Sequence, residues 1–183
     1  MTQPILHTPR LTLRPRTIGD LDASVAMDRE PGTTRWIDGP WDDRAAHEAF
    51  VEARIRGPYP PGLGYWVISR SDEPGGFLGW VLLIPEDATG PRVEIGWRLI
   101  TSARGSGYAP EAAATVMAHG FEHVGLTEIV AEIHRDNHPS RRVARKAGMQ
   151  VQEDPCVTNP DALLYAARID CAGVPERAYL RSP

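Results

Sequence analysis

The chain has 183 residues, of which 42% are hydrophobic and 24% are charged, and its mean hydropathy is −0.33. This is the composition of an ordinary globular protein, and a chain of this length is expected to form one domain over residues 1–183. The net charge of −4 and the sequence pI near 5.9 argue against a nucleic-acid-binding protein, which would carry a basic stripe.

Neither a membrane segment nor a secretory signal is expected. The longest apolar runs, such as residues 80–84, are too short to span a bilayer, and the N-terminus lacks the apolar core of a signal peptide. Cys156 and Cys171 have no metal-binding or redox spacing, so they are expected to be free thiols. The three arginines within residues 141–145 are interpreted as a solvated helix face. We therefore expect a cytoplasmic protein without nucleic-acid or membrane partners.

Hydrophobic periodicity and turn residues predict the elements in chain order. Strands are expected over residues 11–16, 65–70, 77–84, 92–99, 128–134, 151–152 and 162–169. Helices are expected after Asp20, after Asp42 or Asp43, after Gly107 and over residues 140–147, where capping residues or a change of period mark their starts. This order predicts an α/β fold with a mixed central sheet of about six to seven strands and about four flanking helices. The core is expected over about residues 8–170, followed by an irregular C-terminal tail.

The most informative segment, residues 93–111, reads as a strand, an irregular link, a glycine-rich turn and a helix start. The first N–H groups of a helix lack intrahelical partners, and the helix dipole is positive at that end. Glycines allow several such N–H groups to converge on one anion. Pro110 is compatible with this role because a proline in the first turn gives up no needed hydrogen bond. The turn is therefore a candidate phosphate-binding site.

Two other phosphate-binding motifs do not fit this turn. Pro110 stands where the dinucleotide-binding fingerprint needs its third small residue, and no Gly-Lys-Ser/Thr follows as in a P-loop. A tight turn into a helix with no ligand is the remaining structural alternative.

Further motifs make the sequence resemble GNAT acetyltransferases. Residues 104–109 (Arg-Gly-Ser-Gly-Tyr-Ala) resemble the pyrophosphate-binding motif of that family, Gln/Arg-x-x-Gly-x-Gly/Ala. Residues 137–140 (Asn-His-Pro-Ser) and 146–149 (Lys-Ala-Gly-Met) resemble its second motif. Residues 11–15 (Leu-Thr-Leu-Arg-Pro) and 94–97 (Glu-Ile-Gly-Trp) resemble the Rim branch, whose founding members acetylate the N-termini of ribosomal proteins. The motifs fall in the order and spacing of the family over almost the whole chain.

The resemblance implies a single GNAT domain whose sheet splays between its fourth and fifth strands. A bulge in the fourth strand opens the sheet in this family, and the pantetheine arm of acetyl-CoA lies in the opening. Backbone groups of Trp97, Arg98 and Leu99 would pair with the pantetheine amides. The Leu99 N–H would polarise the thioester carbonyl, and the glycine-rich turn would surround the pyrophosphate. The residues implied to bind acetyl-CoA are Trp97, Arg98, Leu99, Arg104, Gly105, Ser106, Gly107, Tyr108, Ala109, Pro110 and Asn137.

Members of this family need no protein nucleophile or metal, because the amine attacks the thioester directly. Glu94 and Glu132 are the candidate bases, and a solvent-facing strand carboxylate is the alternative for each. Many GNAT enzymes carry a tyrosine as proton donor seven residues after the asparagine, but Ala144 stands there in this sequence. Ser140 is the substitute that the Rim resemblance suggests, although a serine at this point also suits a helix N-cap.

Two further groups of residues could bind a metal or a substrate. His119 and His123 have a zinc-compatible spacing, but Gly120 replaces the glutamate that a metalloprotease motif needs, so no metal is expected. Four aromatic residues flank loops near the acceptor side of this fold and either line a substrate pocket or pack under loops: Trp36, Trp41, Tyr59 and Tyr65. Asp38, Asp42 and Asp43 beside them hint at a cationic acceptor.

The sequence thus predicts an N-acetyltransferase that moves an acetyl group from acetyl-CoA to the primary amine of a protein N-terminus or a small molecule. One alternative is a noncatalytic module that binds or senses acyl-CoA. Another is transfer of a longer acyl group such as succinyl, with Arg98 as the cation that would meet it. A homodimer is expected only because it is the commonest symmetric assembly.

Overall fold

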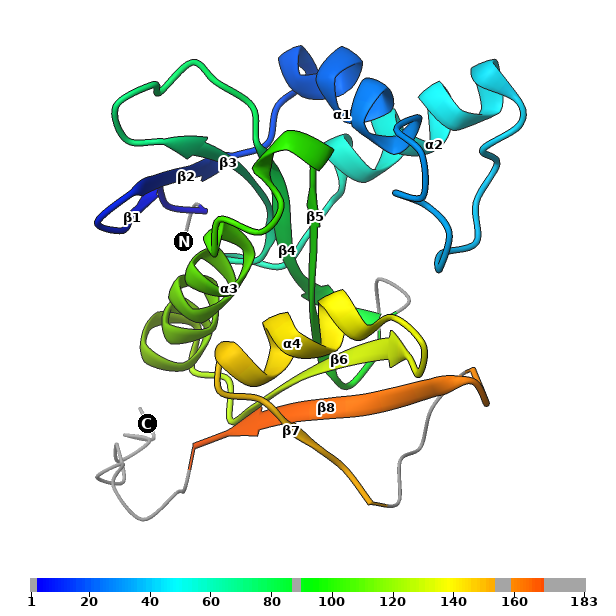
Figure 1. Cartoon of the computed structure of the whole chain (residues 1–183). Coiled ribbons are helices and arrows are strands. Elements are labelled where there is room, and N and C mark those ends of the chain that lie inside the picture. Colours follow the sequence, from blue (N-terminus) through cyan, green and yellow to red (C-terminus); the bar gives the residue numbers. More distant parts are fainter. Residues whose placement is uncertain (1–2, 87–89, 154–158, 170–183) are drawn as a thin grey trace, which may run out of the picture.

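The computed structural model describes residues 3–86, 90–153 and 159–169 (Figure 1). Both cysteines and the tail predicted to be irregular lie outside the described residues. None of the described helices is both long and apolar enough to cross a membrane.

Eight strands form one mixed sheet in the spatial order β1-β2-β3-β4-β5-β6-β8-β7 (Figure 1). The expected α/β sheet is confirmed, with one strand more than the six to seven predicted. The additional strand is β1, whose two residues are too few to show a period in the sequence. The strands are β1 (Leu6–His7), β2 (Leu11–Pro15), β3 (Gly64–Arg70), β4 (Gly79–Pro85), β5 (Val93–Leu99), β6 (Glu128–His134), β7 (Gln150–Val151) and β8 (Ala162–Arg168).

Two pairs of helices cover opposite faces of the sheet (Figure 1): α1 (Leu21–Asp28) and α2 (Arg44–Arg56) on one, α3 (Tyr108–His119) and α4 (His138–Lys146) on the other. On the first face, Met27 of α1 packs with Tyr65 and Trp80. On the second, Val116 of α3 packs in a larger cluster around Trp66. Because successive strand side chains point to opposite faces, β4 is buried along its whole length and β3 along all but its last residue.

The carboxylate predicted to cap α1 stands at the N-cap position but makes no capping hydrogen bond to that helix. Asp20 precedes the helix as predicted, and it accepts hydrogen bonds from the Thr17 amide and from both terminal nitrogens of Arg14. Burial alone would raise the pKa of Asp20, but these donors outweigh it and lower that pKa below its ordinary value. The second helix is capped by Asp43, whose carboxylate accepts from the Ala46 amide at 3.0 Å.

The sheet is nearly divided between β5 and β6. These strands run parallel and pair in register only at Glu94 and Val130, and their C-terminal ends lie apart (Figure 1). The β4–β5 ladder runs through seven consecutive pairs without an inserted residue, so the expected bulge is absent from it. The β6–β8 ladder is equally continuous. The opening arises because β5 and β6 each keep their antiparallel partner, β4 and β8. The fourth and fifth predicted strands, at residues 92–99 and 128–134, are β5 and β6, so the splay predicted between them is confirmed, but without the bulge. We call this opening the split.

A buried ionic cluster fastens both N-terminal helices to β5. Asp28, the last residue of α1, accepts a hydrogen bond from Nη1 of Arg98 on β5, and its other carboxylate oxygen lies 3.1 Å from Nε2 of His47 on α2. The three side chains are between 1% and 8% exposed. Removing one partner of such a cluster leaves an uncompensated charge in a low-dielectric environment.

Replacing Asp28 by Asn is expected to lower the free energy of unfolding by about 3–5 kcal/mol, because the Arg98 cation then stays buried without an anion. Denaturant unfolding followed by circular dichroism measures the change. The control is Glu48→Gln, which removes an exposed partner of Arg44 and is expected to cost less than about 1 kcal/mol. Equal losses in the two variants would contradict the importance of the cluster.

Candidate functional site

Two cavities meet at the split. The first, of about 340 Å³, lies along the glycine-rich turn and is called the turn cavity. The second, of about 410 Å³, extends from the split along the face of the sheet that α1 and α2 cover, and is called the sheet cavity. Five residues line both: Trp36, Trp97, Arg98, Asn137 and Ser140. A ligand in one cavity can therefore reach a ligand in the other across these side chains.

The glycine-rich turn forms one wall of the turn cavity. Gly105 and Gly107 both have φ of +81°, a left-handed conformation that side-chain-bearing residues rarely adopt. Gly107 directly precedes α3, so the first amides of that helix lie at the cavity wall. Of the residues predicted to hold the pyrophosphate, the turn cavity is lined by Arg104, Gly105, Gly107, Tyr108, Ala109 and Pro110, and Ser106 is not among its lining residues.

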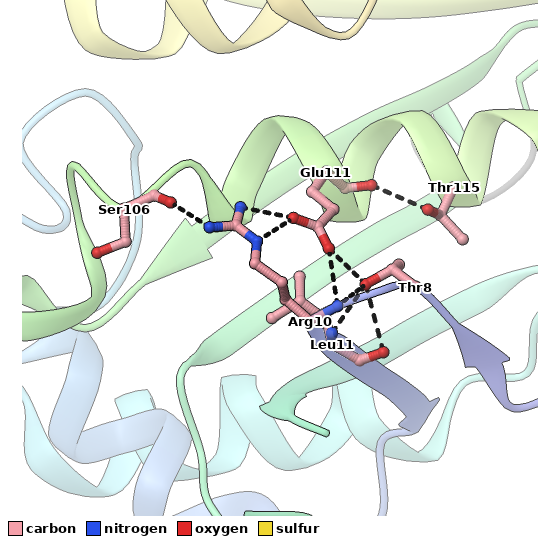
Figure 2. A network of polar contacts seen from close by, with 6 residues as sticks. All are labelled: Thr8, Arg10, Leu11, Ser106, Glu111 and Thr115. Atoms are coloured by element: carbon pink, nitrogen blue, oxygen red, sulfur yellow. Dashed lines mark hydrogen bonds and ion pairs between the residues drawn. The ribbon is translucent and has the colours of Figure 1, made fainter. Parts of the chain in front are cut away.

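Arg10, which the sequence analysis did not single out, holds the turn from outside. Its Nη1 donates to the Ser106 carbonyl at 3.0 Å (Figure 2). The carbonyl and the following N–H of a trans peptide point in opposite directions, so the Gly107 N–H points away from Arg10. The guanidinium also lies over the Tyr108 ring, 5.0 Å from its centroid. Ser106 thus contributes through its backbone orientation.

Glu111 on α3 fixes Arg10 in turn (Figure 2). Its carboxylate accepts from Nε of Arg10 at 2.7 Å and from the Thr8 hydroxyl at 2.5 Å. Burial acts to raise the pKa of Glu111, but the hydrogen bonds from Thr8 and Arg10 prevail and lower it. Glu111 is therefore ionised at neutral pH, and the turn between β1 and β2 is tied to the start of α3.

The loop after α1 braces the other end of the turn. Arg104 donates from Nε to the Leu99 carbonyl at 3.1 Å and from Nη2 to the Thr33 hydroxyl at 2.6 Å. Glu30 accepts from both the amide and the hydroxyl of Thr101, and the hydroxyl bond lowers the pKa of Glu30. Arg104 thus helps to position the backbone at this end of the turn, and it also lines the turn cavity.

Cations on the cavity wall also come from α4. Arg142 and Lys146 both line the turn cavity, so this side of the predicted solvated face contributes to the candidate site. Arg141 turns elsewhere and donates to the Tyr165 hydroxyl and the Arg135 carbonyl. The single sequence could not indicate which arginines of this helix face the cavity.

The hydrogen-bonding pattern of β5 decides which backbone groups face the split. The Ile100 amide donates to the Leu78 carbonyl, on the β4 side, at 3.0 Å. Because alternate pairs of an antiparallel ladder are hydrogen-bonded, every second residue counted back from Ile100 turns its N–H and C=O towards β4. The backbone groups of Arg98 therefore face β4, whereas those of Trp97 and Leu99 face β6. This differs from the expectation that the Arg98 backbone would hold pantetheine, because that backbone belongs to the ladder. Arg98 lines both cavities.

Asn137 and Ser140 lie where β6 leads into α4. The Asn137 carboxamide oxygen accepts from the Ser140 amide at 3.2 Å and caps α4. The helix therefore begins at His138, two residues before the predicted start, and the capping role considered for Ser140 belongs to Asn137. Ser140 is half-buried and lines both cavities. Ala144 is fully buried in the core beneath α4.

The candidate bases Glu94 and Glu132 stand on opposite sides of the split, on β5 and β6. Both are half-buried and both line the sheet cavity. They are therefore placed at a cavity wall instead of on a fully solvent-facing strand surface.

Only part of the predicted acceptor-side cluster lines the sheet cavity. Trp36, Trp41, Tyr65 and Asp38 do so. Tyr59 packs nearby against Tyr65, and its hydroxyl donates to the Arg54 carbonyl. Burial raises the pKa of Tyr59 to about 12, so this phenol stays protonated at neutral pH.

The two histidines with metal-like spacing have other contacts. Nε2 of His119 lies 2.9 Å from the Gly62 carbonyl oxygen, and the His119 ring stacks on His123 with centroids 5.6 Å apart. Within the described parts of the chain, no three His, Cys, Asp or Glu side chains are grouped to hold a metal ion.

Comparison with known proteins agrees with this geometry. Residues 10–150 match the family model described as an acetyltransferase (GNAT) domain. The Aspergillus fumigatus protein named FsC-acetyl coenzyme A-N(2)-transacetylase is 30% identical over 156 residues, which cover 80% of this chain and 65% of that protein. The chain thus spans slightly less than two thirds of the length of that relative.

Solved structures show the same architecture. An acetyltransferase from Agrobacterium tumefaciens is 27% identical and superposes with a TM-score of 0.79, over 92% of this chain and 96% of that one. Mycobacterium smegmatis RimJ, solved in complex with CoA-disulfide, has a TM-score of 0.65 at 24% identity, over 90% of this chain and 86% of that one. The second likeness shows the fold alone, and it places Rim-type enzymes among the structural neighbours.

Replacing Arg10 by Met is expected to weaken coenzyme A binding about three- to tenfold, because the Ser106–Gly107 peptide loses the donor that orients it. Isothermal titration calorimetry measures the dissociation constant. Arg56→Met removes an exposed arginine that pairs with Glu52 and should leave the constant unchanged. An Arg10→Met protein with native affinity would show that the turn needs no such support.

Proposed function

This chain belongs to the GNAT acetyltransferase family, and we propose that it transfers the acetyl group of acetyl-CoA to a primary amine. The observation that carries the proposal is that two cavities meet at residues of β5 and α4, beside the split. The turn cavity offers helix-start amides and the basic side chains of Arg142 and Lys146 to the phosphates of the cosubstrate. The sheet cavity would receive the amine.

We propose that backbone groups beside the split orient the thioester. The Trp97 and Leu99 backbones face the split, so they can pair with the amides of the pantetheine arm. The Leu99 N–H then donates to the thioester carbonyl and stabilises the negative charge that develops on its oxygen during attack. Asn137 retains its side-chain NH2 as a donor, because only its oxygen is used in capping α4.

The chemical step needs two proton transfers. Glu94 or Glu132 accepts the proton of the ammonium, directly or through water, and frees the lone pair that forms the new N–C bond. As the C–S bond breaks, the Ser140 hydroxyl passes a proton to the departing thiolate and regains one from the nitrogen of the collapsing intermediate, which leaves a neutral amide and a neutral thiol. The positions of the two carboxylates and of Ser140 around the same cavity support these roles.

The acceptor is proposed here only as a primary amine. The name of the Aspergillus relative describes acetyl transfer at an N(2) atom, which supports a small-molecule amine. The Rim-type neighbours support a protein N-terminus: a structure from Vibrio cholerae is titled a putative ribosomal-protein-serine acetyltransferase.

Replacing both Glu94 and Glu132 by Gln is expected to reduce the rate of thiol release about 100-fold or more, because no carboxylate then takes the ammonium proton. Acetyl-CoA affinity should stay unchanged, since neither residue lines the turn cavity. Glu122→Gln, at an exposed position after α3, is the control. A native protein that binds acetyl-CoA but acetylates no amine would instead be a noncatalytic acyl-CoA-binding module.

A further inference from the structure

One wall of the sheet cavity contains a buried cation without an ion-pair partner. Arg16 directly follows β2, is 9% exposed and lines this cavity. Its Nη2 donates to the Val51 carbonyl at 3.2 Å, and its Nε is buried without a hydrogen-bond partner. No ion pair involves Arg16 within the described residues. Burying such a charge is costly unless something compensates it.

The nearest carboxylates are engaged with other cations. Asp20 forms an ion pair with Arg14, and Asp28 is held between Arg98 and His47. They act on Arg16 only through space, and burial lowers the pKa of its guanidinium. Arginine nevertheless stays protonated in proteins. The cavity wall therefore keeps a full positive charge with hydrogen-bonding capacity to spare.

Two further buried polar groups that line the sheet cavity also lack hydrogen-bond partners. The Ser24 hydroxyl and Nε of Arg98 are buried without a hydrogen bond, and both residues line the sheet cavity. Together with Arg16, the unsatisfied groups are all able to donate. A cavity wall with a buried cation and unsatisfied donors suits an anionic group, above all a carboxylate, which only accepts.

Aromatic rings connect this cation to the split. The Arg16 guanidinium lies 4.5 Å from the Tyr65 ring centroid, and the Tyr65 ring lies 5.2 Å from that of Trp80. The Trp80 ring in turn lies 5.0 Å from the guanidinium of Arg98, which lines both cavities. The cavity therefore has cationic ends, an aromatic wall between them whose two rings meet edge to face, and Glu94 beside the split.

We propose that the acceptor of the transfer carries a carboxylate several bonds away from its reacting amine, and that Arg16 binds this carboxylate. The inference rests on the proposed function for the placement of the amine at the split. Arg16 reaches over β3, and the split borders β5, two strands further along the sheet. Because adjacent strands lie about 4.8 Å apart, the Arg16 guanidinium and the split are roughly 10 Å apart. The aromatic wall formed by Tyr65 and Trp80 then packs against an apolar spacer.

The assignment to the acceptor follows from the position of Arg16. It lines the sheet cavity and not the turn cavity. A carboxylate on the acyl group, as in succinyl-CoA, would enter from the turn cavity and meet Arg98 first. A carboxylate on the acceptor and a carboxylate on the acyl group present the same chemistry to an arginine, so the experiment must separate these two sources.

The test is a calorimetric titration of the protein saturated with coenzyme A. The probes are ω-amino acids from 4-aminobutanoate to 8-aminooctanoate and, for each, the primary amide that lacks only the charge. The native protein is expected to bind at least one carboxylate about tenfold or more tightly than its amide. In Arg16→Gln this preference should disappear, and in Arg16→Lys part of it should remain. Arg44→Gln, at an exposed arginine of α2 that does not line the sheet cavity, should keep it.

Several results would overturn the proposal. One is that the native protein binds each carboxylate and its amide equally, or binds neither. Another is that a folded Arg16→Gln variant keeps the full preference for the carboxylate over the amide. If that variant does not fold, the native comparison still decides. A loss of succinyl-CoA affinity in Arg16→Gln, with acetyl-CoA affinity kept, would assign the anion to the acyl group instead. Because binding is measured without turnover, a carboxylate preference in a protein that acetylates no amine would refute only the proposed function.

Discussion

The single parallel pair between β5 and β6 is the constraint on which the candidate site depends. β5 satisfies its ladder on the β4 side through seven consecutive pairs, and β6 does the same with β8. Backbone polar groups that are buried need partners, and those of β5 that face β6 beyond Glu94 border the split. A ligand that lies there can take the place of the missing strand. No bulge is needed, since the divergence follows from two antiparallel halves joined at one point.

Long-range contacts hold the rest of the site to that split. Arg10 and Glu111 fix the outer side of the glycine-rich turn, and Arg104 with Thr33 fixes its inner side. The ionic cluster of Asp28, His47 and Arg98 connects α1 and α2, which cover the sheet cavity, to β5. A turn whose amides are already oriented loses less conformational entropy when an anion binds. The fold therefore fixes the glycine-rich turn by side-chain contacts on both of its sides.

The elements that the sequence predicted well are those with a local signal. The strand at residues 128–134 agrees with β6 at both ends because its apolar run is bounded by turn residues. The helix after Gly107 begins at Tyr108 because glycine alone suits the left-handed turn before it. α4 begins earlier than predicted because Asn137 and Ser140 are both acceptable caps, and only the three-dimensional turn selects between them.

Residues whose roles depend on distant partners could not be predicted. Arg10 meets Ser106 across 96 positions, and Arg98 meets Asp28 across 70. Nothing in the local pattern around Arg16 distinguishes it from an exposed arginine beside a strand end. The family resemblance located the glycine-rich turn because its residues are contiguous, whereas the sheet cavity is assembled from β3 to β6, β8, α1, α2, α4 and the loops between them.

The central claim is that the turn cavity binds acetyl-CoA, and a calorimetric titration of three proteins tests it most directly. They are the native chain, Gly107→Val and Gly125→Val. The two glycines have φ of +81° and +82°, so both variants carry similar backbone strain, but only Gly107 lines the cavity. The account predicts binding by the native chain and by Gly125→Val, and its loss in a folded Gly107→Val. Native affinity in Gly107→Val, or no binding by the folded native chain, would contradict it.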